Sequence, residues 1–126
     1  MDAPAADVET SVMPTVLAIV TGALFLVTGG VKVLGVRQSL EIRDHFGFGA
    51  VPWRVIGTLE CAGAVGVLAG IALPELGVAA AAGLAALMLG AIANRLKVED
   101  PVLMVVGDVV VLALVVGTGV STLTAA

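Results

Sequence analysis

Two acidic residues stand in apolar segments, where an isolated charge is costly. Glu60 lies in GTLECAGAVG, residues 57–66, with no Lys or Arg within five positions, and Asp108 lies in VLMVVGDVVVLALVVGTGV. A charge at the centre of a bilayer costs about 2.5–3.5 kcal/mol on insertion scales. Each acid is therefore expected to have a partner or to be protonated. The polar residues that could take part are Lys32, Asn94 and Arg95.

Signatures of a self-sufficient enzyme are missing from the sequence. It contains no nucleophile elbow, phosphate-binding loop, haem-type histidine pair or metal-ligand spacing. His45 is the single histidine, so we interpret it as a surface or interfacial residue rather than a metal ligand. Cys61 follows Glu60, whose charge disfavours a thiolate, so a buried, inert cysteine is favoured and a redox role is left open. We expect no catalytic residue and no metal site. Any enzymatic role would be that of a membrane subunit in an oxidoreductase complex.

The composition is that of a helical membrane protein. Of the 126 residues, 60% are hydrophobic and only 13% are charged, whereas soluble domains carry about 25% charged residues. Sixteen glycines add the small residues through which membrane helices pack. The net charge of −4 gives no basic surface for nucleic acid, so we expect membrane lipids as the surroundings.

Four apolar segments are each long enough to cross a bilayer, which takes about 20 residues. They cover residues 13–36, 51–73, 76–95 and 101–120. Asp100 before Pro101 fits the start of the last helix. The valines of this segment would also suit a buried strand, but the need to pair every backbone group in lipid favours a helix. We predict an all-α fold, a four-transmembrane-helix bundle spanning 13–120, with a polar acidic tail at 1–12 and a short tail at 121–126.

All six basic residues flank the first and third connections of this topology. They are Lys32, Arg37, Arg43, Arg54, Arg95 and Lys97. Because basic residues accumulate on the cytoplasmic side, the loops 37–50 and 96–100 are expected in the cytoplasm and both termini outside.

The first connection, RQSLEIRDHFGFGAVPW, is predicted to form a short interfacial segment. Ser39 is expected to cap a short helix whose Leu40, Ile42 and Phe46 turn toward the membrane, with Trp53 as an interfacial aromatic residue. The alternative is an ordinary solvated loop.

The polar residues of the spans share one depth. At 1.5 Å per helical residue, Glu60 lies about 12 Å, Asp108 about 10 Å and Lys32 about 6 Å from the cytoplasmic surface. Asn94 and Arg95 end the third span. We therefore predict one cluster of these five residues, in which Glu60 contacts Lys32 or reaches Arg95 and Asp108 joins the same network. A neutral Glu60 facing a ligand cavity is the alternative.

A stripe of small residues on the third span predicts close packing against a neighbouring helix. Its members are Ala79, Gly83, Ala86, Gly90 and Asn94. Replacing Gly83 or Gly90 by leucine should then damage folding more than Leu84→Ala. The alternative is that small residues are simply common in such helices. Glycines also mark faces of the first two spans, at Gly22, Gly29, Gly57, Gly63, Gly66 and Gly70.

Three segments resemble motifs of the DoxX-like family of small four-helix membrane proteins. They are FLVTGGVKVLG, RVIGTLECAGAVGVLAG and GLAALMLGAIANRLKVED, and the resemblance covers about residues 16–120. Lys32 and Glu60 occupy motif positions. Many members carry a histidine near Arg95, where this chain departs, which weakens a proton-transfer role based on an imidazole. The resemblance implies limited functional detail, because some members are membrane subunits of thiosulfate:quinone oxidoreductases and many have no assigned activity.

Three functions remain open at this point. The first is an accessory or anchoring subunit of a larger membrane complex, for example a respiratory or redox complex, with other subunits or further copies of this chain as partners. The second is a binding module that holds a quinone or another small amphiphile at the polar cluster. The third is a carrier, which we rank last because the chain has no paired broken helices. No cofactor is expected, with a quinone as the one candidate.

Overall fold

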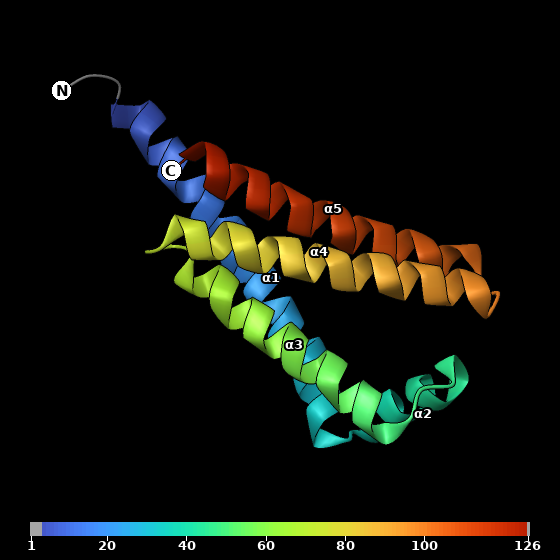
Figure 1. Ribbon diagram of the computed structural model, residues 1–126. Helices are drawn as coiled ribbons and strands as arrows, with labels where there is room; N and C mark the ends of the chain where they lie inside the picture. Colours follow the sequence, from blue (N-terminus) through green and yellow to red (C-terminus); the bar gives the residue numbers. More distant parts are fainter. Residues whose placement is uncertain (1–3, 126) are drawn as a thin grey trace.

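The computed structural model describes residues 4–125, and its regular structure there is entirely helical. The elements in chain order are α1 Pro4–Leu34, α2 Arg37–Phe46, α3 Ala50–Ala69, α4 Pro74–Lys97 and α5 Val102–Ala125 (Figure 1). The predicted all-α fold, with a short helix between the first two long ones, is therefore confirmed.

Four of these helices are long and apolar enough to cross a membrane. The matching segments are Val12–Leu34, Ala50–Ala69, Pro74–Lys97 and Val102–Thr124. Helix α1 begins earlier, at Pro4, within the stretch that the sequence suggests as a tail, and α5 continues past residue 120. Residues 1–3 and 126 of the two predicted tails lie outside the described part of the chain.

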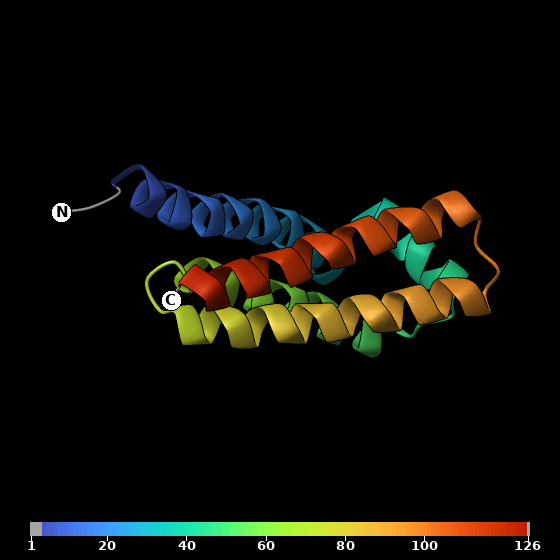
Figure 2. The same ribbon diagram turned by 90° about the horizontal axis from the view of Figure 1, so that it is seen from above.

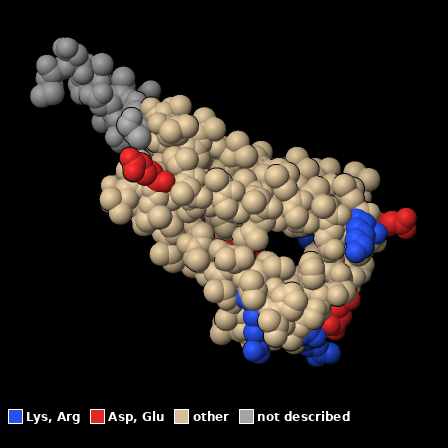
Figure 3. All heavy atoms as spheres, viewed as in Figure 1, with Lys and Arg blue, Asp and Glu red and all other residues tan. Residues whose placement is uncertain are grey.

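The long helices form two pairs that diverge like the arms of a V. Helix α1 packs along α3, and α4 packs along α5. The two arms meet near the chain termini and separate toward α2 and the α4–α5 connection (Figure 1). Figure 2 shows α4 and α5 side by side when the molecule is seen from above. The Lys and Arg residues lie on α2 or near the ends of α1, α3 and α4 at the separated end, and Figure 3 shows basic side chains gathered there.

Glycines allow the closest backbone approaches between helices. A Cβ on Gly29 of α1 would lie 2.6 Å from the carbonyl oxygen of Gly57 in α3. Near the joined end of the arms, the backbones of Gly70, just after α3, and Gly77 of α4 touch, so a Cβ on either would collide with the other. Such contacts hold membrane helices together by packing, because lipid provides no hydrophobic drive for their association.

The face of α4 that packs against the bundle is not the predicted one. Its buried residues are Gly77, Ala81, Leu84 and Met88. Gly83 and Gly90 are exposed, and a Cβ on either would meet nothing within 4 Å. Leu84 is only 1% exposed, and its side chain packs directly against Gly63 of α3. A Cβ on Gly63 would lie 2.6 Å from the Leu84 side chain. The small stripe therefore does not form the predicted helix interface. Its members Ala86, Gly90 and Asn94 line an open space between helices instead, and the close contact pairs the large Leu84 with Gly63.

The core fills the joined half of the V. Phe25 and Val115 are buried there, at 2% and 0% exposure, and a hydrogen bond of 2.8 Å links the hydroxyls of Thr21 and Thr118 between α1 and α5. Both threonines are at most 1% exposed, so the bond satisfies two buried hydroxyls. The separated half encloses a cavity.

Candidate functional site

A cavity of about 510 Å³ lies between the two arms on the side of α2. Figure 3 shows the hollow between the arms. Most of its lining is apolar, and the polar residues predicted from the sequence all line it. These are Lys32, Glu60, Asn94, Arg95 and Asp108. The structure thus brings the five predicted residues to one space, although not into one network.

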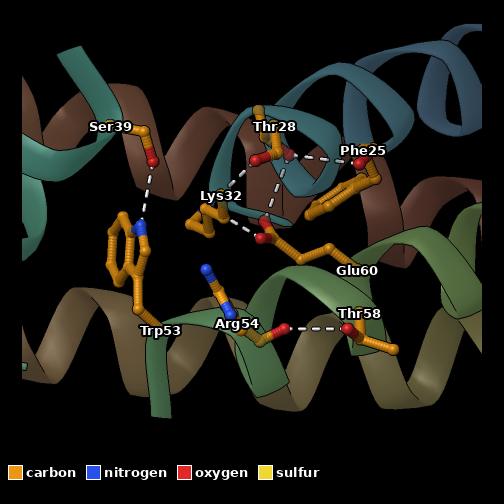
Figure 4. A network of polar contacts seen from close by, with 8 residues as sticks. All are labelled: Phe25, Thr28, Lys32, Ser39, Trp53, Arg54, Thr58 and Glu60. Carbon is orange, nitrogen blue, oxygen red and sulfur yellow. Dashed lines mark hydrogen bonds and ion pairs between the residues drawn. The ribbon is translucent and has the colours of Figure 1, made fainter. Parts of the chain in front are cut away.

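Lys32 and Glu60 form an ion pair on the wall made by α1 and α3. The Lys32 Nζ atom lies 2.7 Å from Glu60 Oε2, and the side chains are 17% and 8% exposed. Thr28 donates a hydrogen bond of 3.1 Å to Glu60 Oε1 (Figure 4). Oε2 receives no directed hydrogen bond from the described residues, so its attraction to Lys32 is that of an ion pair. The predicted contact between Glu60 and Lys32 is therefore present.

Two features of α3 position Lys32. Gly57 lacks a side chain where the stem of Lys32 passes, since a Cβ there would lie 2.7 Å from Lys32 Cβ. The Nζ atom also lies 5.2 Å from the centre of the Trp53 ring, a distance at which the ring attracts a cation.

A hydrogen bond joins Trp53 of α3 to Ser39 of α2. Trp53 is 3% exposed and donates a hydrogen bond of 2.9 Å to Ser39 Oγ (Figure 4). Because a buried indole N–H requires an acceptor, this bond fixes α2 against α3. Val36, without a side-chain cap, occupies the N-cap position of α2. The expected capping by Ser39 is therefore wrong, whereas the depth of Trp53 in the membrane stays a prediction.

The apolar side of α2 turns toward the cavity rather than toward the membrane. Ile42 and Phe46 line the cavity, and Phe46 contacts the rings of Phe48 and Trp53 at centroid distances of 6.2 and 6.4 Å. The prediction of a short amphipathic helix is confirmed, but the direction expected for these two side chains is wrong. The helix covers one side of the cavity with aromatic rings.

Arg95 and Asp108 form a separate pair on the wall made by α4 and α5. Arg95 Nε donates to Asp108 Oδ2, and Arg95 Nη1 donates to Asp100 Oδ2 at 2.9 Å. Asp108 therefore does not join the network of Glu60, contrary to the prediction. The physical reason is the divergence of the arms, which leaves each wall to neutralise its own charges.

Two residues of this second cluster were missed by sequence reasoning. Asp100 Oδ1 lies 2.5 Å from His45 Nε2, which connects α2 to the α4–α5 connection. The hydrogen bond with His45 holds the pKa of Asp100 below its usual value, and Arg95 acts in the same direction against the opposing effect of burial. Asp100 was expected only as a helix cap. The one signal in the sequence was that Asp100 follows Arg95 by only five residues, close enough for the two side chains to pair.

Asn94 has an unused donor at the cavity. Its Nδ2 atom is buried and has no hydrogen-bond partner among the residues that the structure describes. Buried polar groups in native proteins are almost always satisfied, so such an atom calls for a specific explanation.

Possible metal ligands and the single cysteine are the remaining candidates for chemistry. The described residues contain no group of three or more His, Cys, Asp or Glu side chains that could hold a metal ion. Cys61 is partly buried, and a Cβ on Gly29 would lie 2.8 Å from its sulfur. It therefore serves as a packing residue between α1 and α3. The cavity is a mainly apolar space with two charge pairs and, among the described residues, a buried amide donor of Asn94 without a partner, an arrangement that suits binding of a small molecule.

Comparisons with known proteins identify the family. No match is found among curated proteins or among solved structures. A family model described as the DoxX-like family matches residues 16–118, close to the extent of the resemblance seen in the sequence. Together with four helices able to cross a membrane, this match identifies a small multi-pass membrane protein. The chain therefore belongs to the DoxX-like family.

Proposed function

We propose that this protein is a membrane-embedded binding module that holds a small amphiphile between its two helical arms. The observation that carries the proposal is the cavity of about 510 Å³. Pockets for small molecules typically measure about 300–1,000 Å³ and combine an apolar lining with a few placed polar groups. The space between the arms has both properties.

The distribution of the lining residues matches a molecule with an apolar body and a polar head. Leu24, Phe25 and Met88 contribute apolar surface deeper between the arms, whereas Asn94 and Arg95 lie near the end of α4. A head group near Asn94 would leave the apolar body among aliphatic and aromatic side chains. A quinone is one molecule of this class.

The cavity is proposed to lie in the cytoplasmic half of the membrane. All Lys and Arg residues lie at or near the connections at the separated end, and such connections remain preferentially in the cytoplasm. Both termini would then be outside. A reporter that is active only in the cytoplasm should stay inactive when it is fused to the C-terminus. Strong activity would place the cavity in the opposite half.

The role of an accessory or anchoring subunit is the second candidate. Only 11% of the residues in the most apolar window of α5 are buried within the bundle, which leaves a broad apolar face for lipid, another subunit or a second copy of the chain. A stoichiometric partner in a gentle-detergent purification would support this role. Recovery of the chain alone as a monomer would oppose it.

Two glycines of α4 provide a matched test of the binding function. Gly90 lines the cavity and Gly83 does not, yet a Cβ on either would enter open space. Phenylalanine at Gly90 should therefore obstruct the cavity, while phenylalanine at Gly83 serves as the control. Thermal stability should be measured in mild detergent with a panel of amphiphiles that includes short-chain quinones.

A ligand at about 100 times its Kd should stabilise the parent by about 2.7 kcal/mol. The Gly83→Phe variant should show the same shift, and the Gly90→Phe variant should show little or none. The binding function is refuted if no amphiphile shifts the parent, or if both variants respond as the parent does.

A further inference from the structure

We infer that the head group held in this cavity is electrically neutral and accepts a hydrogen bond from Asn94, so that anionic and cationic amphiphiles are rejected. The inference rests on the proposed binding function and specifies its ligand class. It follows from the charge balance of the cavity walls and from the buried donor of Asn94, which has no partner among the described residues.

The charged groups that line the cavity already neutralise one another. Among the described lining residues there are two cations, Lys32 and Arg95, and two anions, Glu60 and Asp108. Lys32 contacts Glu60 on one wall, and Arg95 contacts Asp108 on the other. Asp100 lies outside the lining and is held by Arg95 and His45.

A charged head group would have to break one of these pairs. An anion would need Lys32 or Arg95, and either would leave a carboxylate without its cation in a poorly solvated space. A cation would need Glu60 or Asp108 and would leave a basic group unpaired. Removing one partner of a buried ion pair is strongly unfavourable, whereas a neutral head leaves both pairs intact.

The free amide of Asn94 defines what the neutral head must offer. Its Nδ2 atom is buried and lacks a partner among the described residues, so an acceptor placed beside it would complete the site. A carbonyl or ether oxygen meets this requirement. The rings of Phe46, Phe48 and Trp53 line the same space and can contact the apolar atoms that follow the head.

The single tryptophan makes direct measurement possible. Trp53 is the only tryptophan of the chain, lines the cavity and is 3% exposed, so surrounding lipid has little access to it. Three probes share one brominated alkyl chain and differ in the head, which is a methyl ketone, a carboxylate or a trimethylammonium group. Bromine quenches tryptophan fluorescence at short range. Saturable quenching in lipid nanodiscs, expressed per probe in the lipid phase, therefore reports occupancy.

The ketone probe is expected to bind at least about tenfold more tightly than either charged probe. Asn94→Leu should weaken the ketone about fivefold, the effect of one lost hydrogen bond. The control Ala93→Leu, at an exposed neighbour outside the lining, should leave its affinity unchanged. Asn94→Asp would give the walls a net negative charge and should shift the preference toward the ammonium probe.

The outcomes separate the two levels of the proposal. Binding of the carboxylate or ammonium probe as tight as that of the ketone overturns the neutral-head inference and leaves the binding function standing. An unchanged ketone affinity in both Asn94 variants overturns the role of its amide. If none of the three probes quenches Trp53 saturably, the binding function fails and the inference fails with it.

Discussion

Replacing Lys32 by methionine keeps the length of the side chain but leaves Glu60 without its cation. The charged atoms lie 2.7 Å apart, and the two side chains are 17% and 8% exposed. At an effective dielectric constant of 20, the attraction between unit charges at this distance is about 6 kcal/mol before desolvation is subtracted. Breaking one member of a buried pair typically costs about 3–5 kcal/mol. We use the lower end, because Lys32 keeps some contact with solvent.

The double variant Lys32→Met with Glu60→Gln should recover much of this loss. The neutral glutamine side chain introduced by Glu60→Gln no longer needs a cation, and its carbonyl oxygen can still accept the hydrogen bond from Thr28. The loss of the Lys32 contact with the Trp53 ring remains, at about 0.5–1 kcal/mol. We therefore expect Lys32→Met to lower the free energy of unfolding by about 3 kcal/mol and the double variant by only about 1 kcal/mol.

Thermal unfolding followed by circular dichroism in mild detergent measures the difference. For a chain of this size, 1 kcal/mol corresponds to roughly 4 °C, so the single variant should melt about 8 °C below the double. Arg37 and Glu41 are the control, because they form an exposed pair at 3.7 Å with side chains 94% and 68% exposed. The unfolding free energies of the two single variants of this pair and of their double variant should depart from additivity by no more than about 0.5 kcal/mol. The single variant Glu60→Gln completes the comparison. If the double variant loses as much free energy of unfolding as the two single variants together, the pairing of Lys32 with Glu60 is wrong.

Three further changes test other parts of the structure. Gly70→Leu should lower the apparent melting temperature by roughly 5 °C or more, because its side chain would collide with the backbone of α4, whereas Gly83→Leu should leave it near the parent value. Ser39→Ala removes the acceptor of a buried indole N–H and should cost about 1–3 kcal/mol in unfolding free energy, with a changed tryptophan emission spectrum. Because contacts with His45 and Arg95 lower the pKa of Asp100, its contribution to stability should be complete above the ordinary value of 3.8 and lost as the pH falls through the lowered value. Asp100→Asn should therefore destabilise the protein at neutral pH and reduce its loss of stability in acid, and an unchanged acid profile would contradict this role.

The span positions and the depth of the polar residues could be predicted because lipid constrains both. A span needs a fixed length of apolar helix, and a charged residue needs a neighbour at its own depth. These two requirements placed Glu60 within reach of Lys32 or Arg95, of which the structure shows Lys32, and brought Asn94 and Asp108 to the same end of the bundle.

Which face of each helix packs against the bundle could not be predicted in this way. A small residue such as Gly83 permits close packing, but it is equally tolerated facing lipid, and its spacing is the same in both cases. The contact that forms instead places Leu84 against Gly63, where the large residue is on α4. A match between a large side chain on one helix and a glycine on the other depends on both helices. It cannot be predicted from the residue spacing of either helix alone.

The divergence of the arms is the second feature that the sequence does not reveal. It assigns Asp108 to Arg95 rather than to Glu60, and it opens the space that Phe46 covers. Depth gives a position along the helix axis only. The lateral position follows from how tightly each helix pair packs.

Native mass spectrometry of the protein released gently from its own membrane tests the binding function most directly. The parent and the Gly83→Phe variant should each retain one small amphiphile per chain after detergent exchange, and Gly90→Phe should have lost it. A parent chain that carries no such molecule, or a Gly90→Phe variant that retains it at the same occupancy, would contradict the assignment of this cavity as a binding site.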